Sequence, residues 1–330
     1  MAFVWLQRDR RYTGELRFDR IFDGIGLVAI AFTLCACANP SPGLSRADER
    51  PQVVATSTII ANLTEAIAAE EVELVGLLPP GSDPHIYEPV PNDTKAIERA
   101  DLILYNGFNL EPALIRLMQA SGEQTQKLAV GEVVEPLAMV AGQKQADPHV
   151  WGDVENAIAM TQAIRDALIA LSPEDTATFT TNAQTLTAQL SQLDAWITTQ
   201  IATIPAQNRK LVTTHDAFQY YAHAYGLELI GTLIGISTEE QPSVRTVQTL
   251  VKAIRTAQIP AIFAETTINP QLIKTVAAEA GVNLAPQALY SDSIGAPGSR
   301  GDSYLKMMAA NTQSIVESLG GRFTPFQPSP

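Results

Sequence analysis

The apolar positions in residues 52–172 follow two alternating patterns. Short apolar runs have the composition of buried strands, and the segments between them have the three- and four-residue spacing of amphipathic helices. We predict strands at 52–57, 72–78, 102–105 and 134–137, and helices at 59–69, 91–100 and 153–171. Because strands that alternate with helices are typical of parallel βαβ units, this region predicts an α/β lobe.

A longer helical pattern follows between Pro173 and Pro205. One apolar stripe is kept for about seven turns at 3.6 residues per turn. Its members are Phe179, Leu186, Leu190, Leu193, Ile197, Ile201 and Ile204. Because proline can begin a helix but interrupts its interior, the pattern predicts one long helix over 173–204. A helix of this length in mid-chain would join two lobes as a stiff rod.

The alternation of strands and helices resumes after this helix. We predict strands at 210–214, 227–231, 261–264 and 284–289, a helix that ends at 225, and helices at 243–257, 270–280 and 304–319. Residues 205–330 therefore predict a second lobe. The predicted fold class is α/β, with two parallel-sheet lobes joined by a long rigid helix.

The N-terminal segment has the pattern of a secretory signal peptide. Five arginines precede an apolar run at 24–34, which is short for a membrane span. The run ends in Leu34-Cys35-Ala36-Cys37, which resembles a bacterial lipobox with Cys37 as the lipidated residue. We predict a signal peptide over 1–36 and a flexible tether over 37–51; the alternative is a signal peptide that is cleaved nearby without lipid. The protein is expected in the periplasm or outside the cell, anchored by lipid to a bacterial membrane.

Composition narrows the classes of partner and site. A hydrophobic content of 46% over 330 residues supports a sizeable core. The formal net charge of −13 disfavours nucleic acid and anionic lipid surfaces as partners. The only two cysteines, Cys35 and Cys37, lie in the N-terminal segment. Nitrogen and oxygen atoms must therefore hold any metal ion in the body of the protein.

The chain contains only four histidines, and three lie in distinctive settings. These are Gly81-Ser82-Asp83-Pro84-His85-Ile86-Tyr87-Glu88-Pro89, Asp147-Pro148-His149-Val150-Trp151 and Thr213-Thr214-His215-Asp216-Ala217-Phe218, so Asp-Pro-His occurs twice, 64 positions apart. Imidazole is the commonest protein ligand of divalent transition metals. His85, His215 and Asp292 each follow a predicted strand, where open parallel sheets bind ligands. The pattern predicts a metal site assembled by the fold, although an isolated histidine is more often a hydrogen-bonded structural residue.

Together these segments resemble a known family. The similarity extends over about residues 52–320, and the matching stretches are the first two histidine segments, Ala100-Asp101-Leu102-Ile103-Leu104-Tyr105-Asn106-Gly107, Thr214-His215-Asp216-Ala217-Phe218 and Asp292-Ser293-Ile294-Gly295. The chain resembles the metal-binding solute-binding proteins of the zinc and manganese ABC importers, of cluster A-I type. The resemblance implies two α/β lobes joined by a backbone helix, with one metal ion between them bound by His85, His149, His215 and Asp292. It also implies an ABC permease as partner, and we expect a monomer.

The resemblance leaves two metals open. Manganese-type members often have glutamate where this chain has His215, and zinc-type members often have histidine where this chain has Asp292, together with a histidine-rich loop. The corresponding loop here, 141–146, contains no histidine. Three imidazoles and one carboxylate suit zinc, which also stands above manganese in affinity. A bidentate Asp292 would suit manganese, so we expect zinc first and manganese second, one ion per chain.

Two other classes of function were weighed. A zinc-dependent hydrolase usually leaves one position of the metal open for water, whereas four protein ligands close the site, and the chain has no HExxH motif. An extracellular adhesin is the other alternative, but nothing in the sequence indicates a separate adhesive surface. We therefore expect a transport component and not an enzyme.

Five residues near the histidines carry smaller expectations. Glu265 is expected either to support a histidine by hydrogen bonding or to be a solvated loop carboxylate. Trp151 and Tyr87 are expected to pack around the site. We expect Asp216 to cap the helix that follows it, and His223 to be structural or exposed.

Overall fold

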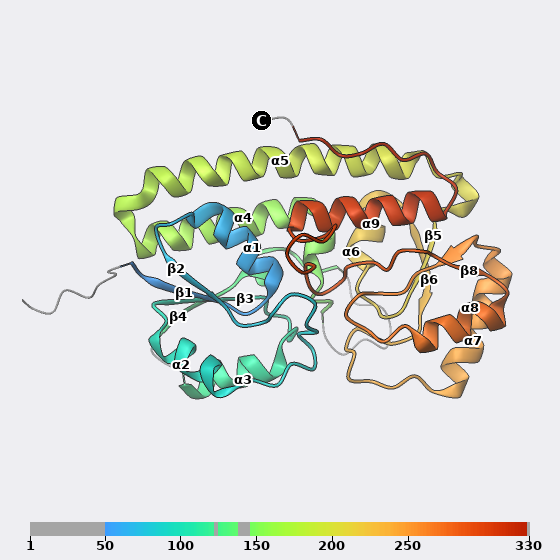
Figure 1. The fold of residues 1–330 in the computed structure, drawn as a ribbon, viewed down its shortest axis with the longest axis horizontal. Coiled ribbons are helices and arrows are strands. Elements are labelled where there is room, and N and C mark those ends of the chain that lie inside the picture. Colours follow the sequence, from blue (N-terminus) through green and yellow to red (C-terminus); the bar gives the residue numbers. More distant parts are fainter. Residues whose placement is uncertain (1–49, 122–124, 138–145, 329–330) are drawn as a thin grey trace, which may run out of the picture. The chain divides into compact units, whose positions relative to one another are not determined.

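Residues 50–121, 125–137 and 146–328 are described by a computed structural model of the protein. Two α/β lobes lie beside each other, and the long helix α5 runs past both of them (Figure 1). Residues 48–330 form one compact unit. The two-lobed α/β fold with parallel strands agrees with the prediction, while the boundaries 52–172, 173–204 and 205–330 remain predictions.

The first lobe is built on a four-stranded parallel sheet. Its strands are β1 (Gln52–Ala55), β2 (Glu73–Gly76), β3 (Leu102–Tyr105) and β4 (Gln126–Ala129), in the order β2-β1-β3-β4. Three of the four predicted strands are confirmed, but the prediction at 134–137 is wrong. The fourth strand lies earlier because Gln126–Ala129 pairs with β3 at an edge of the sheet. An edge strand that is not fully buried, with polar Gln126 and Lys127, gives little apolar signal.

Helices cover both faces of this sheet. They are α1 (Thr58–Ala68), α2 (Pro91–Arg99), α3 (Pro112–Ser121) and α4 (Val154–Leu171). Because side chains alternate along a strand, Val53 and Ala55 join the core with α1 and α4, whereas Val54 packs with α2 and α3. The predicted start of α4 is confirmed, since the Asp153 side chain accepts a hydrogen bond from the backbone N–H of Glu155 at 2.9 Å. Helix α3 has no counterpart among the predicted elements.

Helix α5 (Thr176–Ala202) confirms the long helical pattern. All seven apolar residues of the predicted stripe are buried. Helix α5 packs against α1, α4 and α9 (Figure 1). One cluster of buried side chains runs from Val53 in the first lobe to Leu319 in the second. The two lobes therefore share a core along this helix, which favours a fixed arrangement over a wide hinge.

The second lobe also contains only parallel strand pairs in its described part. They are β5 (Lys210–Thr213) with β6 (Glu228–Thr232), and β7 (Ala261–Ile262) with β8 (Asn283–Leu284). The backbone N–H of Phe263 donates to the Val212 carbonyl at 2.9 Å and so joins the two pairs. Strands β7 and β8 are shorter than predicted. Beyond them the chain forms an isolated parallel bridge between Glu265 and Leu289.

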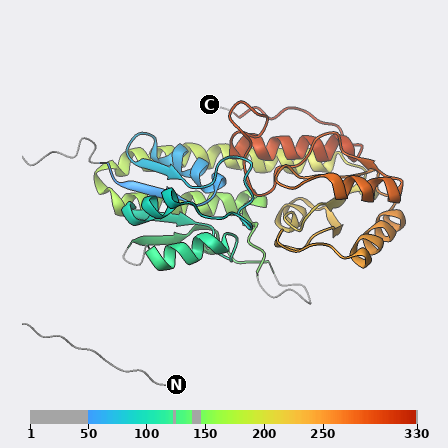
Figure 2. The same ribbon diagram turned by 60° about the horizontal axis from the view of Figure 1, so that its bottom comes forward.

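The helices of this lobe match the predicted segments. They are α6 (Gln219–Tyr225), α7 (Val244–Ala257), α8 (Gln271–Ala280) and α9 (Tyr304–Ser318). In Figure 2, α7 and α8 (orange) lie at the end of the molecule away from the first lobe, and α9 (red) lies along α5. Short 3₁₀ turns lie at Val130–Val133, Val150–Gly152, Pro173–Asp175 and Ala206–Asn208.

No helix within the described ranges is long and apolar enough to cross a membrane. The predicted signal peptide (1–36), Cys37 and nearly all of the predicted tether (37–51) lie outside the described residues.

Candidate metal centre

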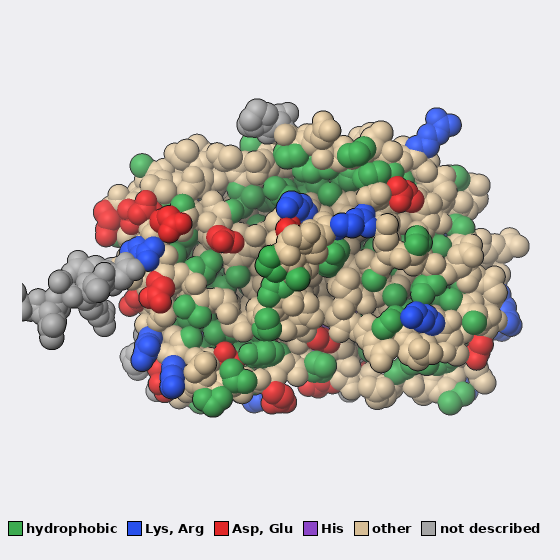
Figure 3. Space-filling view, viewed as in Figure 1, with side chains coloured by type: hydrophobic (Ala, Val, Ile, Leu, Met, Phe, Trp, Pro, Cys, Tyr) green, Lys and Arg blue, Asp and Glu red, His purple; other side chains and the backbone are tan. Residues whose placement is uncertain are grey.

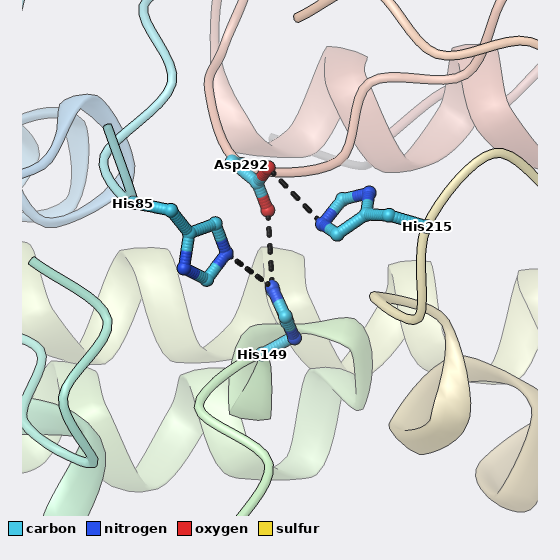
Figure 4. Close-up of side chains that lie close together, drawn as sticks. All are labelled: His85, His149, His215 and Asp292. Carbon is cyan, nitrogen blue, oxygen red and sulfur yellow. Dashed lines mark hydrogen bonds and ion pairs between the residues drawn. The ribbon is translucent and has the colours of Figure 1, made fainter. Parts of the chain in front are cut away.

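Four side chains from both lobes meet at one point (Figure 4). His85 lies in the loop after β2, and His149 directly precedes the 3₁₀ turn Val150–Gly152. His215 lies two residues after β5, and Asp292 lies in the segment after β8. One ligand atom of each residue lies within 4.8 Å of those of the other three. The family resemblance implied these four residues as one site, and the fold brings them together.

The cluster is inside the protein. His149 and His215 have no exposed surface, and the exposed fractions of Asp292 and His85 are 1% and 3%. No histidine of the described chain is visible on the face drawn in Figure 3. At such burial, each polar atom needs a partner to offset its lost hydration.

Several of these polar atoms have no such partner. Asp292 Oδ1 lies 3.3 Å from His149 Nε2, and Asp292 Oδ2 lies 3.3 Å from His215 Nε2. These distances suit ion pairs, but neither contact has the geometry of a hydrogen bond, so His215 Nε2 and both Asp292 oxygens are unsatisfied. Buried unsatisfied atoms are rare in folded proteins. Their convergence indicates a centre that a cation would complete.

The spacing of the atoms fits a small metal ion. Besides the two contacts of Asp292, His85 Nε2 lies 3.2 Å from His149 Nε2. Tetrahedral ligands at about 2.0–2.1 Å from zinc lie roughly 3.3 Å from one another. The donor set has three imidazoles and a carboxylate, which fits the predicted nitrogen and oxygen chemistry.

Two buried carboxylates fix two of the imidazole rings. Asp147 Oδ1 accepts from the backbone N–H of His149 at 3.0 Å and from its Nδ1 at 2.6 Å. Glu265 binds His215 in the same way, through the backbone N–H at 2.8 Å and through Nδ1. In the neutral tautomer that these bonds favour, Nδ1 carries the proton and Nε2 presents its lone pair to the centre. The supporting role expected for Glu265 is confirmed, and the solvated alternative is wrong because its exposed fraction is 2%.

The first histidine is held by its loop. Asp83 Oδ1 accepts from the backbone N–H of His85 at 2.9 Å, and Asp83 Oδ2 accepts from the Thr238 hydroxyl at 2.6 Å. Gly81 has φ +84°, a conformation that favours glycine, and its N–H donates to the Ser293 hydroxyl at 2.8 Å. No pattern in the sequence predicts that Thr238 and Ser293 lie here, because contacts between loops leave no periodic signal.

Carboxylates raise the pKa of two imidazoles. Burial, the largest influence, lowers the pKa of His149, but Asp147 and Asp292 outweigh it and raise that pKa to about 9. Burial likewise opposes the charged form of His215, yet Glu265 and Asp292 raise its pKa well above the usual value. While the site holds no metal ion, both shifts favour the protonated form of the imidazole.

The pKa values of the other two residues of the cluster, His85 and Asp292, are lowered. Burial is the main reason that the pKa of His85 falls to about 3, although Asp292 opposes it. Burial raises the pKa of Asp292, but the charges of His215 and His149 outweigh it and hold that pKa well below its usual value. The cluster thus presents a neutral imidazole and an ionised carboxylate beside two imidazoles that must lose a proton before they bind a metal ion.

Four residues near the histidines in the sequence have different surroundings in the structure. The Trp151 ring packs against His149 at 5.4 Å between centroids, and Trp151 Nε1 donates to the Ser291 carbonyl at 3.0 Å. Tyr87 packs beside the first-lobe core and donates to Asp93 at 3.0 Å. The expectation that Asp216 caps α6 is wrong, because its side chain accepts from that of Gln219. His223 is exposed.

Comparisons with known proteins place this centre in context. A family model described as "Zinc-uptake complex component A periplasmic" matches residues 53–318. The metal ABC transporter substrate-binding lipoprotein FimA of Streptococcus parasanguinis is 36% identical over 301 residues, covering 88% of this chain and 96% of the relative. The manganese-binding lipoprotein MntA of Bacillus subtilis is 37% identical over 295 residues, covering 87% and 95%.

Solved structures share the fold. The periplasmic zinc-binding protein TroA from Treponema pallidum has a TM-score of 0.78 and 34% identity, covering 82% of this chain and 99% of that chain. The manganese-bound periplasmic metal-binding protein from Candidatus Liberibacter asiaticus has a TM-score of 0.74 and 26% identity, covering 82% and 100%.

Proposed function

Since the chain belongs to the family of the periplasmic component A of zinc-uptake complexes, we propose that it captures a divalent transition metal ion outside the cytoplasm and delivers it to an ABC permease. The chain is a metal-binding, substrate-binding component of an ABC transporter, and we propose a role in transport without catalysis. The metal ion is its cargo. The delivery step and the partner permease are part of the proposal.

The proposed ligands are His85, His149, His215 and Asp292. The observation that carries this assignment is the convergence of four buried side chains whose polar atoms are partly unsatisfied. A metal ion would exchange its water shell for three Nε2 atoms and the Asp292 carboxylate, while the protons of His149 and His215 leave. Four protein ligands fill a tetrahedral zinc site, which argues against hydrolysis at this centre.

Zinc is the first candidate cargo, because three imidazoles and one carboxylate match its ligand preference. Manganese is the second candidate. Both oxygens of Asp292 face imidazoles of the cluster, so the carboxylate is placed to bind through both atoms and raise the coordination number. Relatives are named for manganese and for zinc.

We propose a lipid anchor at Cys37, which would keep the protein beside its permease in the periplasm or outside the cell. The support is the lipobox-like sequence together with relatives that are named lipoproteins. In the native host, Cys37→Ser should move the protein from the membrane fraction to the soluble fraction. If the distribution stays unchanged, the anchor at Cys37 is wrong.

Calorimetric titration with zinc and with manganese tests the ligand assignment. His215→Ala should remove high-affinity binding of both metals, because it deletes a ligand and leaves Asp292 facing one ring fewer. His223→Ala is the matched control, since His223 is exposed on α6 and lies outside the cluster. Equal affinities for wild type and His215→Ala would overturn the site.

A further inference from the structure

The hydrogen bond between Thr238 and Asp83 connects the two lobes beside the proposed centre. We infer that Thr238 is a positioning residue for the metal ion: its hydroxyl holds the Asp83 carboxylate, and Asp83 holds His85. The inference rests on the proposed ligand set. It adds a residue from the second lobe that controls a ligand of the first lobe without touching the metal ion.

The geometry makes Asp83 a two-sided link. One carboxylate oxygen accepts from the backbone N–H of His85 at 2.9 Å, and the other accepts from Thr238 Oγ1 at 2.6 Å. Thr238 lies in the segment between β6 and α7 of the second lobe, 155 positions from Asp83. The exposed fraction of Asp83 is 9%, so water competes little for either bond.

A carboxylate holds His85 through its backbone only, whereas carboxylates hold His149 and His215 through their rings as well. The rings of His149 and His215 are fixed by carboxylates at Nδ1. Among the contacts of the described residues, no carboxylate accepts from the ring of His85. The ring of His85 contacts the rings of His149 and His215, and its backbone N–H is held by Asp83.

The loop that carries His85 is attached to the second lobe at two points. Gly81 is bound by Ser293, the residue after Asp292, and Asp83 is bound by Thr238. The first attachment keeps the loop close to the Asp292 ligand. The second lies on the open side, because Asp83 and Thr238 line a surface groove of about 390 Å³.

This groove lies beside the loop that carries His85, and none of the four proposed ligands lines it. Its other lining residues include Ile86, directly after His85, and Leu272 and Thr275 of α8. Of the four proposed ligands, His85 is the one with the largest exposed fraction, 3%. Release of a metal ion requires His85 to move away from it, and the hydroxyl of Thr238 opposes that movement through Asp83.

The test compares variants that differ in one hydroxyl. Metal release into excess chelator is followed by stopped flow for wild type, Thr238→Val and Thr238→Ser. Thr238→Val removes the donor at nearly constant volume and should speed release by about 10- to 100-fold, the range for loss of a group that supports a metal ligand. Thr238→Ser restores the hydroxyl and should stay within about 3-fold of wild type.

A control in the same groove isolates the contact. Thr275 is an exposed groove residue whose hydroxyl bonds the Gln271 carbonyl of its own helix, so Thr275→Val should leave release unchanged. In the metal-free protein, histidine side-chain NMR signals report on each ring. Thr238→Val should shift the signal of His85 more than those of His149 and His215, a selective change that a general loss of stability would not produce.

Each result bears on one claim. Wild-type release rates in Thr238→Val, or equal rates in Thr238→Val and Thr238→Ser, overturn the role of Thr238 and leave the ligand set intact. Failure of the wild-type protein to bind zinc or manganese overturns the proposed function itself, and this inference with it.

Discussion

The two Asp-Pro-His segments have the same sequence but hold their histidines differently. Asp147 binds both the backbone N–H and the ring of His149. Asp83 binds only the backbone N–H of His85, and its second oxygen reaches Thr238 in the other lobe. The shared element is a short turn in which the carboxylate accepts the N–H of the residue two positions later.

The different use of the carboxylate changes the chemistry of the imidazoles. Asp147 is a main reason that the pKa of His149 rises to about 9, whereas burial lowers the pKa of His85 to about 3. His149 is therefore a charged ring in a fixed orientation before a metal ion binds. His85 is a neutral ring whose position depends on its loop.

Removal of either ring is the most severe test. His149→Ala and His85→Ala each delete a proposed ligand and should each weaken metal binding by more than roughly 100-fold. A loss of about 100-fold is the upper end for a residue that only supports a ligand. Competition against a chelator of known affinity measures the change. Retention of wild-type affinity in His85→Ala alone would make the second Asp-Pro-His a ligand segment and the first a structural turn.

The pH dependence of metal affinity is the next test, and it distinguishes His149, which must lose a proton, from His85, which is already neutral. Because the pKa of His149 is raised to about 9 and that of His215 is also raised, the charged forms of both rings are favoured before binding, and metal binding should release their protons. Affinity should therefore fall by up to about 100-fold per pH unit as the pH is lowered below 7. Calorimetry in buffers of different ionisation enthalpy should give about two protons released per ion. We assign them to His149 and His215, because the lowered pKa of His85 leaves that ring neutral. A count near zero would contradict the role given to Asp147.

The same shift predicts the stability of the metal-free protein. A raised pKa means that protonation of His149 stabilises the fold. This contribution is fully present below the usual pKa of 6.5 and is lost as the pH rises through about 9. Thermal unfolding without metal should therefore occur at a higher temperature at pH 6.5 than at pH 9.5, and His149→Ala should reduce the difference.

Replacing the aspartate of each Asp-Pro-His segment by asparagine tests the contribution of its carboxylate. Asp147→Asn removes the charge that orients and polarises the His149 ring, and should cost about 10- to 100-fold in metal affinity. Asp83→Asn keeps an oxygen for the His85 N–H and offers an amide N–H to the Thr238 hydroxyl, so we expect a loss below about 3-fold. Chelator competition on both variants provides the comparison, and equal losses would show that the two segments work alike.

The aromatic residues two positions after each histidine give the smallest effects. Trp151→Phe leaves the Ser291 carbonyl without its donor and should lower the free energy of unfolding by ~1–3 kcal/mol, with a small loss of metal affinity. Tyr87→Phe removes a hydroxyl from a partly exposed contact with Asp93 and should change neither quantity measurably. Denaturant unfolding of both variants measures the difference, and a larger loss in Tyr87→Phe would contradict the asymmetry.

Strong periodic patterns made much of the fold predictable. The α5 stripe and the buried strands β1 and β3 follow from burial, which imposes a fixed spacing on apolar residues. Strand β4 and helix α3 were missed, and strand β4 owes its pairing to a neighbour rather than to an apolar pattern of its own.

The sequence by itself determined the α/β class and the long helix, because burial periodicity is a local signal, and its resemblance to a known family implied the four residues that converge. Only the tertiary structure decided how the repeated Asp-Pro-His is used. Whether a carboxylate oxygen meets the Nδ1 of a ring or the hydroxyl of Thr238 depends on which chain segment packs against the turn. That contact joins residues far apart in the sequence, so nothing within the tripeptide specifies it.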